Sequence, residues 1–274
     1  MNNYHYQWLN TYQPKRPTLV CLHGFTGCLD TFELLKDCFD FNILGIDLPG
    51  HGQTKTHQPT DYAFLNVLDN LHQILQELDL KNFHLLGYSM GGRVALGFNL
   101  RYPSLVKSLI LESSTAGLDT YEKRFLRQCS DAKLAANLWN NELEEFVDFW
   151  QDITLFASQK KNLSDLQRQL LRTQRLKQDK FSLALSLKYM GTGSQPNYWP
   201  YIKNLTCPLL YVAGQEDFKF CGIGQKICAY VLNADMQICP KVGHCVHLEA
   251  PKWFTDTVLL WLKEQEKKDE NCGS

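Results

Sequence analysis

A serine flanked by glycines is the residue of this chain best suited to chemistry. Residues 87–93 read Gly-Tyr-Ser-Met-Gly-Gly-Arg and follow the apolar run 83–86. Glycine two positions either side of Ser89 permits a strained strand-to-helix turn that side chains would obstruct. Such a turn presents the hydroxyl at the start of a helix, where backbone N–H groups stabilise a developing negative charge. Ser89 is therefore predicted to be catalytic, and Arg93, one helical turn further on, to face the same site.

A serine hydroxyl needs a base to take up its proton, and that base needs an acidic partner to orient it. The only histidines after Ser89 are His244 and His247, and His244 follows a glycine that lets its loop bend. A short carboxylate, Asp217, ends the run Ala-Gly-Gln-Glu-Asp that follows an apolar segment. Ser89, Asp217 and His244 are predicted to form a catalytic triad. The neighbouring acid, Glu216, is expected on the surface, and His247 is expected to point elsewhere.

An anion that develops beside the serine requires two N–H donors, which together form an oxyanion hole. One donor is expected to be the backbone N–H of Met90, the residue after the serine. The other is expected from the loop after the first apolar strand, which reads His-Gly-Phe-Thr-Gly at 23–27. Gly24 permits close approach of the backbone, and Phe25 is predicted to supply the second N–H.

Apolar runs alternate with helical patterns on both sides of the serine, as in a mostly parallel sheet that is covered by helices on both faces. Strands are predicted at 18–22, 41–47, 83–86, 105–111, 208–213 and 236–239, and helices over 30–38, 61–78, 90–101 and 253–262.

The strand pattern is interrupted between the two halves of this sheet. Residues 118–188 are amphipathic and helical throughout, in the position where a lid is commonly inserted. The predicted organisation is a first core part at 1–115, a helical cap at 116–195, a second core part at 196–266, and a frayed tail at 267–274.

Composition narrows the partners of the chain. Its 274 residues include 28 Lys and Arg against 29 Asp and Glu, a formal net charge of -1. This balance does not suit a general binder of nucleic acid or of anionic membrane surfaces. No apolar run approaches the ~20 residues needed to span a membrane. The N-terminus lacks the basic and apolar regions of a secretion signal.

The ten cysteines never occur as Cys-x-x-Cys, so a zinc site is not expected. Several lie within apolar, strand-like runs, where cysteine behaves as a small buried side chain. Reduced thiols and a cytoplasmic location are therefore expected. The sequence does not determine the oligomeric state, and a monomer is compatible with it.

These motifs together resemble the α/β-hydrolase superfamily, whose fold is a mostly parallel sheet flanked by helices, here with a helical cap inserted between strands. The resemblance also includes Asp-Leu-Pro-Gly-His-Gly at 47–52 and Gly-His at 243–244. A narrower resemblance, to the 2-succinyl-6-hydroxy-2,4-cyclohexadiene-1-carboxylate synthases of menaquinone and phylloquinone biosynthesis, rests on four further motifs. These are Phe-Trp at 149–150, Leu-Phe-Ala-Ser-Gln at 155–159, Met-Gly-Thr-Gly-Ser-Gln-Pro at 190–196, and Asp-Phe-Lys-Phe at 217–220.

The narrower resemblance implies a lyase that eliminates pyruvate from 2-succinyl-5-enolpyruvyl-6-hydroxy-3-cyclohexene-1-carboxylate, without a metal or organic cofactor. Ser89 would then act as the base, with His244 activating it and Asp217 orienting His244. Carboxylates of such a substrate call for bidentate guanidinium donors. The family pattern selects Arg124 and Arg175 to join Arg93, although periodicity cannot separate them from Arg127, Arg168 and Arg172. Tyr88 and Trp150 match pocket positions of the family.

Two other functions remain open. A carboxylesterase or carbon–carbon bond hydrolase would use Ser89 as a covalent nucleophile, and it would need an apolar or neutral pocket. A catalytically inactive receptor of the same fold is the alternative without an activity. The predicted arginines favour a small polycarboxylate substrate and hence the elimination.

Overall fold

The computed structural model describes residues 4–38 and 40–272. Within them, one sheet has the strand order β1-β3-β2-β4-β5-β6-β7, in which β1 pairs antiparallel to β3 and all other neighbours are parallel. The strands are β1 (Tyr6–Trp8), β2 (Thr18–Leu22), β3 (Asn42–Ile46), β4 (Phe83–Tyr88), β5 (Val106–Glu112), β6 (Leu209–Gly214) and β7 (Ala234–Cys239). The predicted mostly parallel sheet is therefore confirmed.

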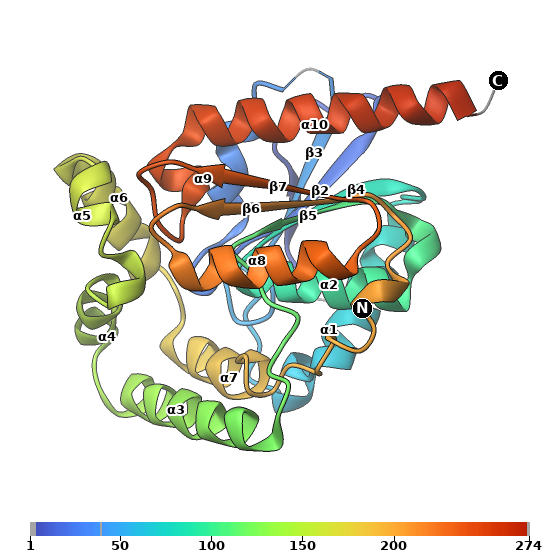
Figure 1. The fold of residues 1–274 in the computed structure, drawn as a ribbon. Helices are drawn as coiled ribbons and strands as arrows, with labels where there is room; N and C mark the ends of the chain where they lie inside the picture. Colours follow the sequence, from blue (N-terminus) through green and yellow to red (C-terminus); the bar gives the residue numbers. More distant parts are fainter. Residues whose placement is uncertain (1–3, 39, 273–274) are drawn as a thin grey trace.

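Helices cover both faces of the sheet (Figure 1). One face carries α1 (Phe64–Glu77), α2 (Met90–Arg101) and α8 (Phe218–Tyr230), and the other carries α10 (Pro251–Cys272) with the short α9 (Val246–Glu249). Strands β2, β3, β4 and β6 are buried along their whole length, which explains their continuous apolar runs. Successive residues of β4 point to opposite sides: Leu85 belongs to the core under α1 and α2, and Leu86 to the core under α10.

Five helices lie between β5 and β6, beyond the ends of the strands (Figure 1), and we call them the cap. They are α3 (Tyr121–Asn140), α4 (Leu143–Gln151), α5 (Gln159–Asn162), α6 (Asp165–Leu176) and α7 (Lys180–Met190). Three of them begin at residues whose side chains cap the helix: Thr120, Ser164 and Asp179 accept hydrogen bonds from backbone N–H groups of the first turn. A small apolar core holds the cap together, formed by Ala135, Leu138, Phe146, Leu183, Ala184 and Leu187.

Several elements differ from the sequence expectation. The helix expected over 30–38 is a 3-10 helix, η1 (Leu29–Leu35), with a break at Phe32, whose φ and ψ are -106° and 17°. The helix expected over 61–78 starts later, after η2 (Pro59–Tyr62). The remaining 3-10 helices are η3 (Pro103–Leu105), η4 (Thr154–Phe156) and η5 (Ile202–Asn204).

The final helix, α10, continues to Cys272 through most of the segment that was expected to be frayed. Glu266, directly before this segment, has partners on the sheet: its Oε1 lies 2.9 Å from His84 Nε2 and also pairs with Lys107. These contacts hold α10 against β4 and β5 at this point. Residues 273–274 lie outside the described residues.

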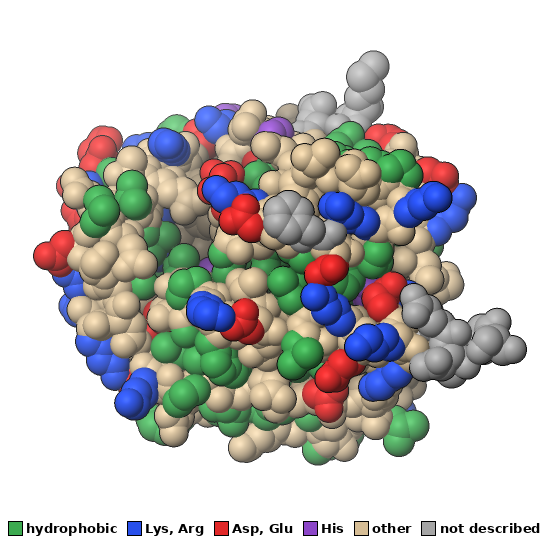
Figure 2. Space-filling model, turned by 90° about the horizontal axis from the view of Figure 1, so that it is seen from above, with side chains coloured by type: hydrophobic (Ala, Val, Ile, Leu, Met, Phe, Trp, Pro, Cys, Tyr) green, Lys and Arg blue, Asp and Glu red, His purple; other side chains and the backbone are tan. Residues whose placement is uncertain are grey.

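Charges of both signs are interspersed over the face seen in Figure 2, in keeping with the small net charge. The cysteines described by the structure are free thiols. None of the described helices is long and apolar enough to cross a membrane.

Candidate active site

The turn around Ser89 joins β4 to α2, and its backbone explains the glycine spacing. Ser89 has a φ of 48°, a left-handed conformation that is strained for a residue with a side chain. A Cβ on Gly91 would lie 2.1 Å from the carbonyl oxygen of Leu22, and one on Gly87 would lie 2.5 Å from that of Gly91. Only glycine fits either position. The Ser89 N–H donates to the carbonyl of Glu112 at 2.8 Å, which fixes the turn to the end of β5.

The structure brings Ser89, His244 and Asp217 together at the ends of three strands. His244 Nε2 lies 3.0 Å from Ser89 Oγ, and His244 Nδ1 lies 2.6 Å from Asp217 Oδ2. With Nδ1–H donating to the carboxylate, Nε2 is free to accept the proton of the serine hydroxyl. His244 and Asp217 are both buried, and the centroid of the Phe220 ring lies 4.7 Å from that of the His244 ring. This geometry suits a serine whose proton is removed by histidine.

The other two candidates for triad positions point elsewhere. Glu216 pairs with Lys161 at the surface. His247 is engaged with another residue, because its Nδ1 lies 2.9 Å from a carboxylate oxygen of Glu112, which is fully buried. The Glu112–His247 pair was not expected from the sequence. It fastens the start of α9, just after His244, to the end of β5.

Phe25 and Met90, the expected oxyanion-hole residues, both line the pocket that contains Ser89. His23 supports the loop that carries Phe25, since its Nδ1 donates to the Gly24 carbonyl at 2.8 Å and its Nε2 accepts the Leu48 N–H at 3.0 Å. Burial lowers the pKa of His23, in keeping with a neutral ring.

Gln178, in the cap, also supports this loop. Its side-chain oxygen accepts the Gly52 N–H at 2.9 Å, and its amide donates to the Gly27 carbonyl at 3.1 Å. The cap thus helps to position the loop beside the serine.

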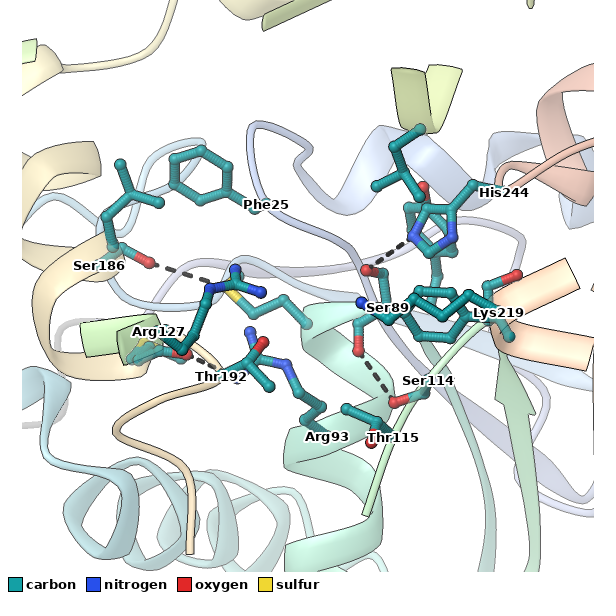
Figure 3. Close-up of a pocket in the computed structure, with 18 of the residues that line it drawn as sticks. Phe25, Ser89, Arg93, Ser114, Thr115, Arg127, Ser186, Thr192, Lys219 and His244 are labelled. Carbon is teal, nitrogen blue, oxygen red and sulfur yellow. Dashed lines mark hydrogen bonds between the residues drawn. The ribbon is translucent and has the colours of Figure 1, made fainter. Parts of the chain in front are cut away.

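The pocket at Ser89 is a cavity of about 130 Å³ with three basic side chains and no Asp or Glu among the described residues that line it. The basic residues are Arg93 on α2, Arg127 on α3 and Lys219 on α8. Figure 3 shows Ser89 and His244 joined by a hydrogen bond on one side, with Arg93 and Arg127 on the other. Its remaining lining residues are Phe25, Tyr88, Ser89, Met90, Ser113, Ser114, Thr115, Trp150, Leu155, Phe156, Ser186, Leu187, Met190, Gly191, Thr192, Phe220 and His244.

Arg93 is held in an unfavourable electrostatic position. It is buried and donates from Nη1 to the Met190 carbonyl at 2.7 Å, and no ion pair joins it to a carboxylate among the described residues. Burial, together with the nearby charge of Arg127, lowers the pKa of Arg93 to about 9. Burial and Arg127 also lower the pKa of Lys219. Asp131, which pairs with Arg127 at 2.7 Å, offsets part of this effect on Arg93. An anion in the pocket would still be stabilised by Arg93 and Lys219, whose pKa values burial lowers.

Arg127, and not the expected Arg124, lines this pocket. Both lie on α3 three residues apart, so they point in directions that differ by about 60° around the helix. Arg124 Nε instead lies 3.5 Å from the Gly193 carbonyl. The turn 190–196 packs against α3 so closely that a Cβ on Gly193 would lie 2.9 Å from the Arg124 carbonyl oxygen. The structure therefore places Arg127 nearer to Ser89 than Arg124, and which of the two binds substrate stays a prediction.

Arg175 does not line the pocket at Ser89, although it is close by. It is 4% exposed, lies 5.4 Å above the ring of Phe156, and borders an adjoining cavity of about 100 Å³. Its Nε has no hydrogen-bond partner among the described residues. Phe156, whose ring Arg175 overlies, borders both cavities, so Arg175 and the triad contact adjoining spaces.

The two expected aromatic residues, Tyr88 and Trp150, do line the pocket. The Tyr88 hydroxyl, however, lies 2.7 Å from Cys245 Sγ, so it is already engaged with the protein. Trp150 packs edge-on against Phe25 with ring centroids 5.2 Å apart, and its Nε1 is buried without a partner in the described part of the chain. Trp150 therefore has an unused donor in or beside the pocket.

Lys219 was not selected from the sequence. It lies two residues after Asp217, in the first turn of α8, and this short spacing from the acid could have indicated it. Thr192 of the turn 190–196 also lines the pocket, which gives that motif a place in the site.

Comparisons with known proteins give the fold and the family of the chain. Residues 17–251 match the model of the alpha/beta hydrolase fold family. A putative 2-succinyl-6-hydroxy-2,4-cyclohexadiene-1-carboxylate synthase from Bacillus subtilis is 40% identical over 246 residues, 89% of each chain. The synthase of that name from Klebsiella pneumoniae is 31% identical over 240 residues, 87% of this chain and 91% of its own.

Among solved structures, MenH from S. aureus superimposes with a TM-score of 0.90 at 32% identity, over 97% of this chain and 100% of that one. An esterase from Thermogutta terrifontis, at 20% identity and a TM-score of 0.81 over 96% and 93% of the two chains, shares the fold. Because identity and coverage are both high for the synthases, the chain belongs to the 2-succinyl-6-hydroxy-2,4-cyclohexadiene-1-carboxylate synthase family of the α/β-hydrolase fold.

Proposed function

We propose that this protein eliminates pyruvate from 2-succinyl-5-enolpyruvyl-6-hydroxy-3-cyclohexene-1-carboxylate to give 2-succinyl-6-hydroxy-2,4-cyclohexadiene-1-carboxylate. The observation that carries the proposal is the set of three cations around a Ser–His–Asp group, with no carboxylate among the described lining residues. A site of this kind suits a small substrate with several carboxylates. The relationship to synthases of this name supports the same reaction and its place in menaquinone biosynthesis.

Ser89 is the base in the proposed mechanism. His244 Nε2 accepts the hydroxyl proton, and Ser89 Oγ then takes a proton from carbon. The released electron pair moves through the ring double bond and expels the enolpyruvyl oxygen, so a carbon–oxygen bond breaks and the enolate of pyruvate leaves. This enolate takes up the proton that His244 received, which gives pyruvate and returns His244 to its neutral form. Asp217 holds the His244 ring and stabilises its positive charge. These steps need no metal or organic cofactor.

Negative charge that develops on the substrate is stabilised by two sets of donors. The backbone N–H groups of Phe25 and Met90 serve as the oxyanion hole. Arg93 and Arg127 bind carboxylates directly, with Lys219 as a third positive charge. A permanently charged guanidinium suits this task, because its planar donors match a carboxylate.

The remaining candidates take lesser roles in this proposal. Trp150 offers its free Nε1–H, and Tyr88 shapes the pocket wall. Arg175 contributes through the adjoining cavity, whereas Arg124 supports the turn 190–196. We further propose a cytoplasmic monomer, consistent with the free thiols of the described cysteines.

The test is the formation of pyruvate and of the cyclohexadiene product from the enolpyruvyl substrate by purified wild-type protein. The proposal expects the two products in equal amounts. Absence of both products from folded protein would contradict the proposal.

A carboxylesterase remains the alternative, because an ester substrate could acylate Ser89 once His244 activates it. It predicts turnover of neutral esters that does not depend on Arg93.

A further inference from the structure

Glu249, in the short helix α9, links the cap to the loop that carries His244. Its Oε2 accepts the backbone N–H of Gly243 at 3.0 Å, and Gly243 directly precedes His244. The same oxygen accepts from Asn162 Nδ2 at 2.7 Å, and Oε1 accepts from Ser158 Oγ at 3.0 Å. One carboxylate therefore receives one donor from the histidine loop and two from the cap.

The contact between cap and loop is close as well as polar. A Cβ on Gly243 would lie 2.1 Å from Ser158 Oγ, so a larger residue there would displace the Ser158 hydroxyl from Glu249. Asn162 Nδ2 also donates to the Lys241 carbonyl at 2.9 Å, which holds the start of the same loop. The Val242 carbonyl of this loop also accepts the backbone N–H of Glu216 at 2.9 Å, and Glu216 directly precedes Asp217.

The cap segment that reaches Glu249 also reaches the pocket. Phe156 precedes Ser158 by two residues, lines the pocket at Ser89, and lies 6.2 Å from the His244 ring, centroid to centroid. Movement of this segment would therefore displace both Ser158 at Glu249 and Phe156 at the pocket. Tight packing transmits such displacements instead of absorbing them.

We infer that Glu249 is a positioning residue that makes the placement of His244 depend on the seating of the cap. Its carboxylate holds the Gly243 N–H only while Ser158 and Asn162 satisfy its other lone pairs. When the cap is displaced, the carboxylate loses these donors and the histidine loop loosens. The inference deepens the proposed function, on which its activity measurement rests.

The first variant is Glu249→Ala, compared with wild type in two assays. One is kcat and KM for pyruvate release. The other is the rate at which phenylmethylsulfonyl fluoride modifies Ser89, which requires no natural substrate. In that reaction an Oγ–S bond forms, the S–F bond breaks, fluoride leaves, and the serine proton goes to His244. The second assay therefore measures activation of Ser89 even if the proposed reaction is wrong.

We expect Glu249→Ala to lower kcat and the modification rate by about 10²-fold, the effect of displacing a catalytic group by about 1 Å. KM should change much less, because the cations of the pocket lie on α2, α3 and α8. The conservative variant Glu249→Gln keeps one oxygen for the Gly243 N–H and should recover part of the loss. It also serves if the alanine variant does not fold.

The cap side is tested with Ser158→Ala, because Asn162 also holds the loop directly through the Lys241 carbonyl. Ser158→Ala should lower the modification rate in the same direction as Glu249→Ala, and adding it to Glu249→Ala should cause little further loss. The matched control is Lys161→Ala. It removes a cap side chain three residues after Ser158 that pairs with Glu216 at the surface. The control should keep wild-type rates.

Folded Glu249→Ala with wild-type modification rate would overturn the inference. Additive losses in the combined variant would overturn it too, because the two sides would then act independently. If wild type releases no pyruvate but its modification rates follow the expected pattern, the proposed reaction fails and the positioning role stands.

Discussion

Replacing Arg93 by methionine should make the protein more stable and less active. The present electrostatic cost follows from the lowering of the Arg93 pKa from 12.5 to about 9, which corresponds to about 5 kcal/mol. Loss of the hydrogen bond to Met190 offsets about 1 kcal/mol of this gain. The space left by the guanidinium offsets about 2 kcal/mol more. A net stabilisation of about 2 kcal/mol should raise Tm by about 4–8 °C.

Activity should move in the opposite direction. A charge-assisted hydrogen bond to a carboxylate contributes about 1.5–3 kcal/mol, so kcat/KM for the polycarboxylate should fall by about 10- to 150-fold.

The sign of the stability change follows from linkage. A guanidinium whose pKa is lower in the folded than in the unfolded protein destabilises the fold throughout the neutral range, where it is charged.

The assays are differential scanning calorimetry without ligand and steady-state pyruvate release. The matched control is Arg101→Met on the same helix, because Arg101 is exposed and paired with Asp69. The control should change neither kcat/KM nor, by more than about 1 kcal/mol, the stability. A less stable Arg93→Met protein that turns over the polycarboxylate as wild type does would show that Arg93 is neither destabilising nor a carboxylate ligand.

Arg127→Gln should raise KM about 10-fold in steady-state assays, because it removes a pocket charge but keeps an amide donor near Asp131. An equal increase in KM for Arg124→Gln would contradict the placement of the two arginines. Gly91→Ala should destabilise the protein by about 3 kcal/mol or more in urea unfolding, because its Cβ would meet the Leu22 carbonyl; an unchanged midpoint would count against the described turn. Glu266 has a pKa of about 2, lowered chiefly by the hydrogen bond to His84. Its contribution to stability is present above the ordinary value of 4.5 and is lost as pH falls towards 2, so the stability advantage of wild type over Glu266→Gln should shrink in that window. A stability advantage that stays constant between pH 4.5 and 2 would contradict the hydrogen bond between Glu266 and His84.

The catalytic group and the sheet could be predicted because local sequence determines them. The glycines around Ser89 are required by backbone contacts within a few residues, and the buried parallel strands need continuous apolar runs. The acid and the histidine follow strand ends, so their place at one edge of the sheet follows from the order of strands.

The cation set could be predicted only in part. Arg124 and Arg127 have the same periodicity on α3, and the packing of the turn 190–196 decides which of them faces the serine. Arg175 lies behind Phe156, which depends on the tertiary placement of α6. The docking of α10 on the sheet involves partners of Glu266 that are far away in sequence. In each case a contact between distant segments carries the missing information.

In the proposed mechanism Ser89 acts as a proton-abstracting base. This role is tested by pyruvate release by Ser89→Ala and by wild type, together with the intact mass of wild type quenched during turnover. A proton-abstracting Ser89 predicts a loss of about 10²- to 10⁴-fold in kcat for the variant and no covalent adduct on the wild-type enzyme. An acylated Ser89 during turnover, or a variant that releases pyruvate at the wild-type rate, would contradict it.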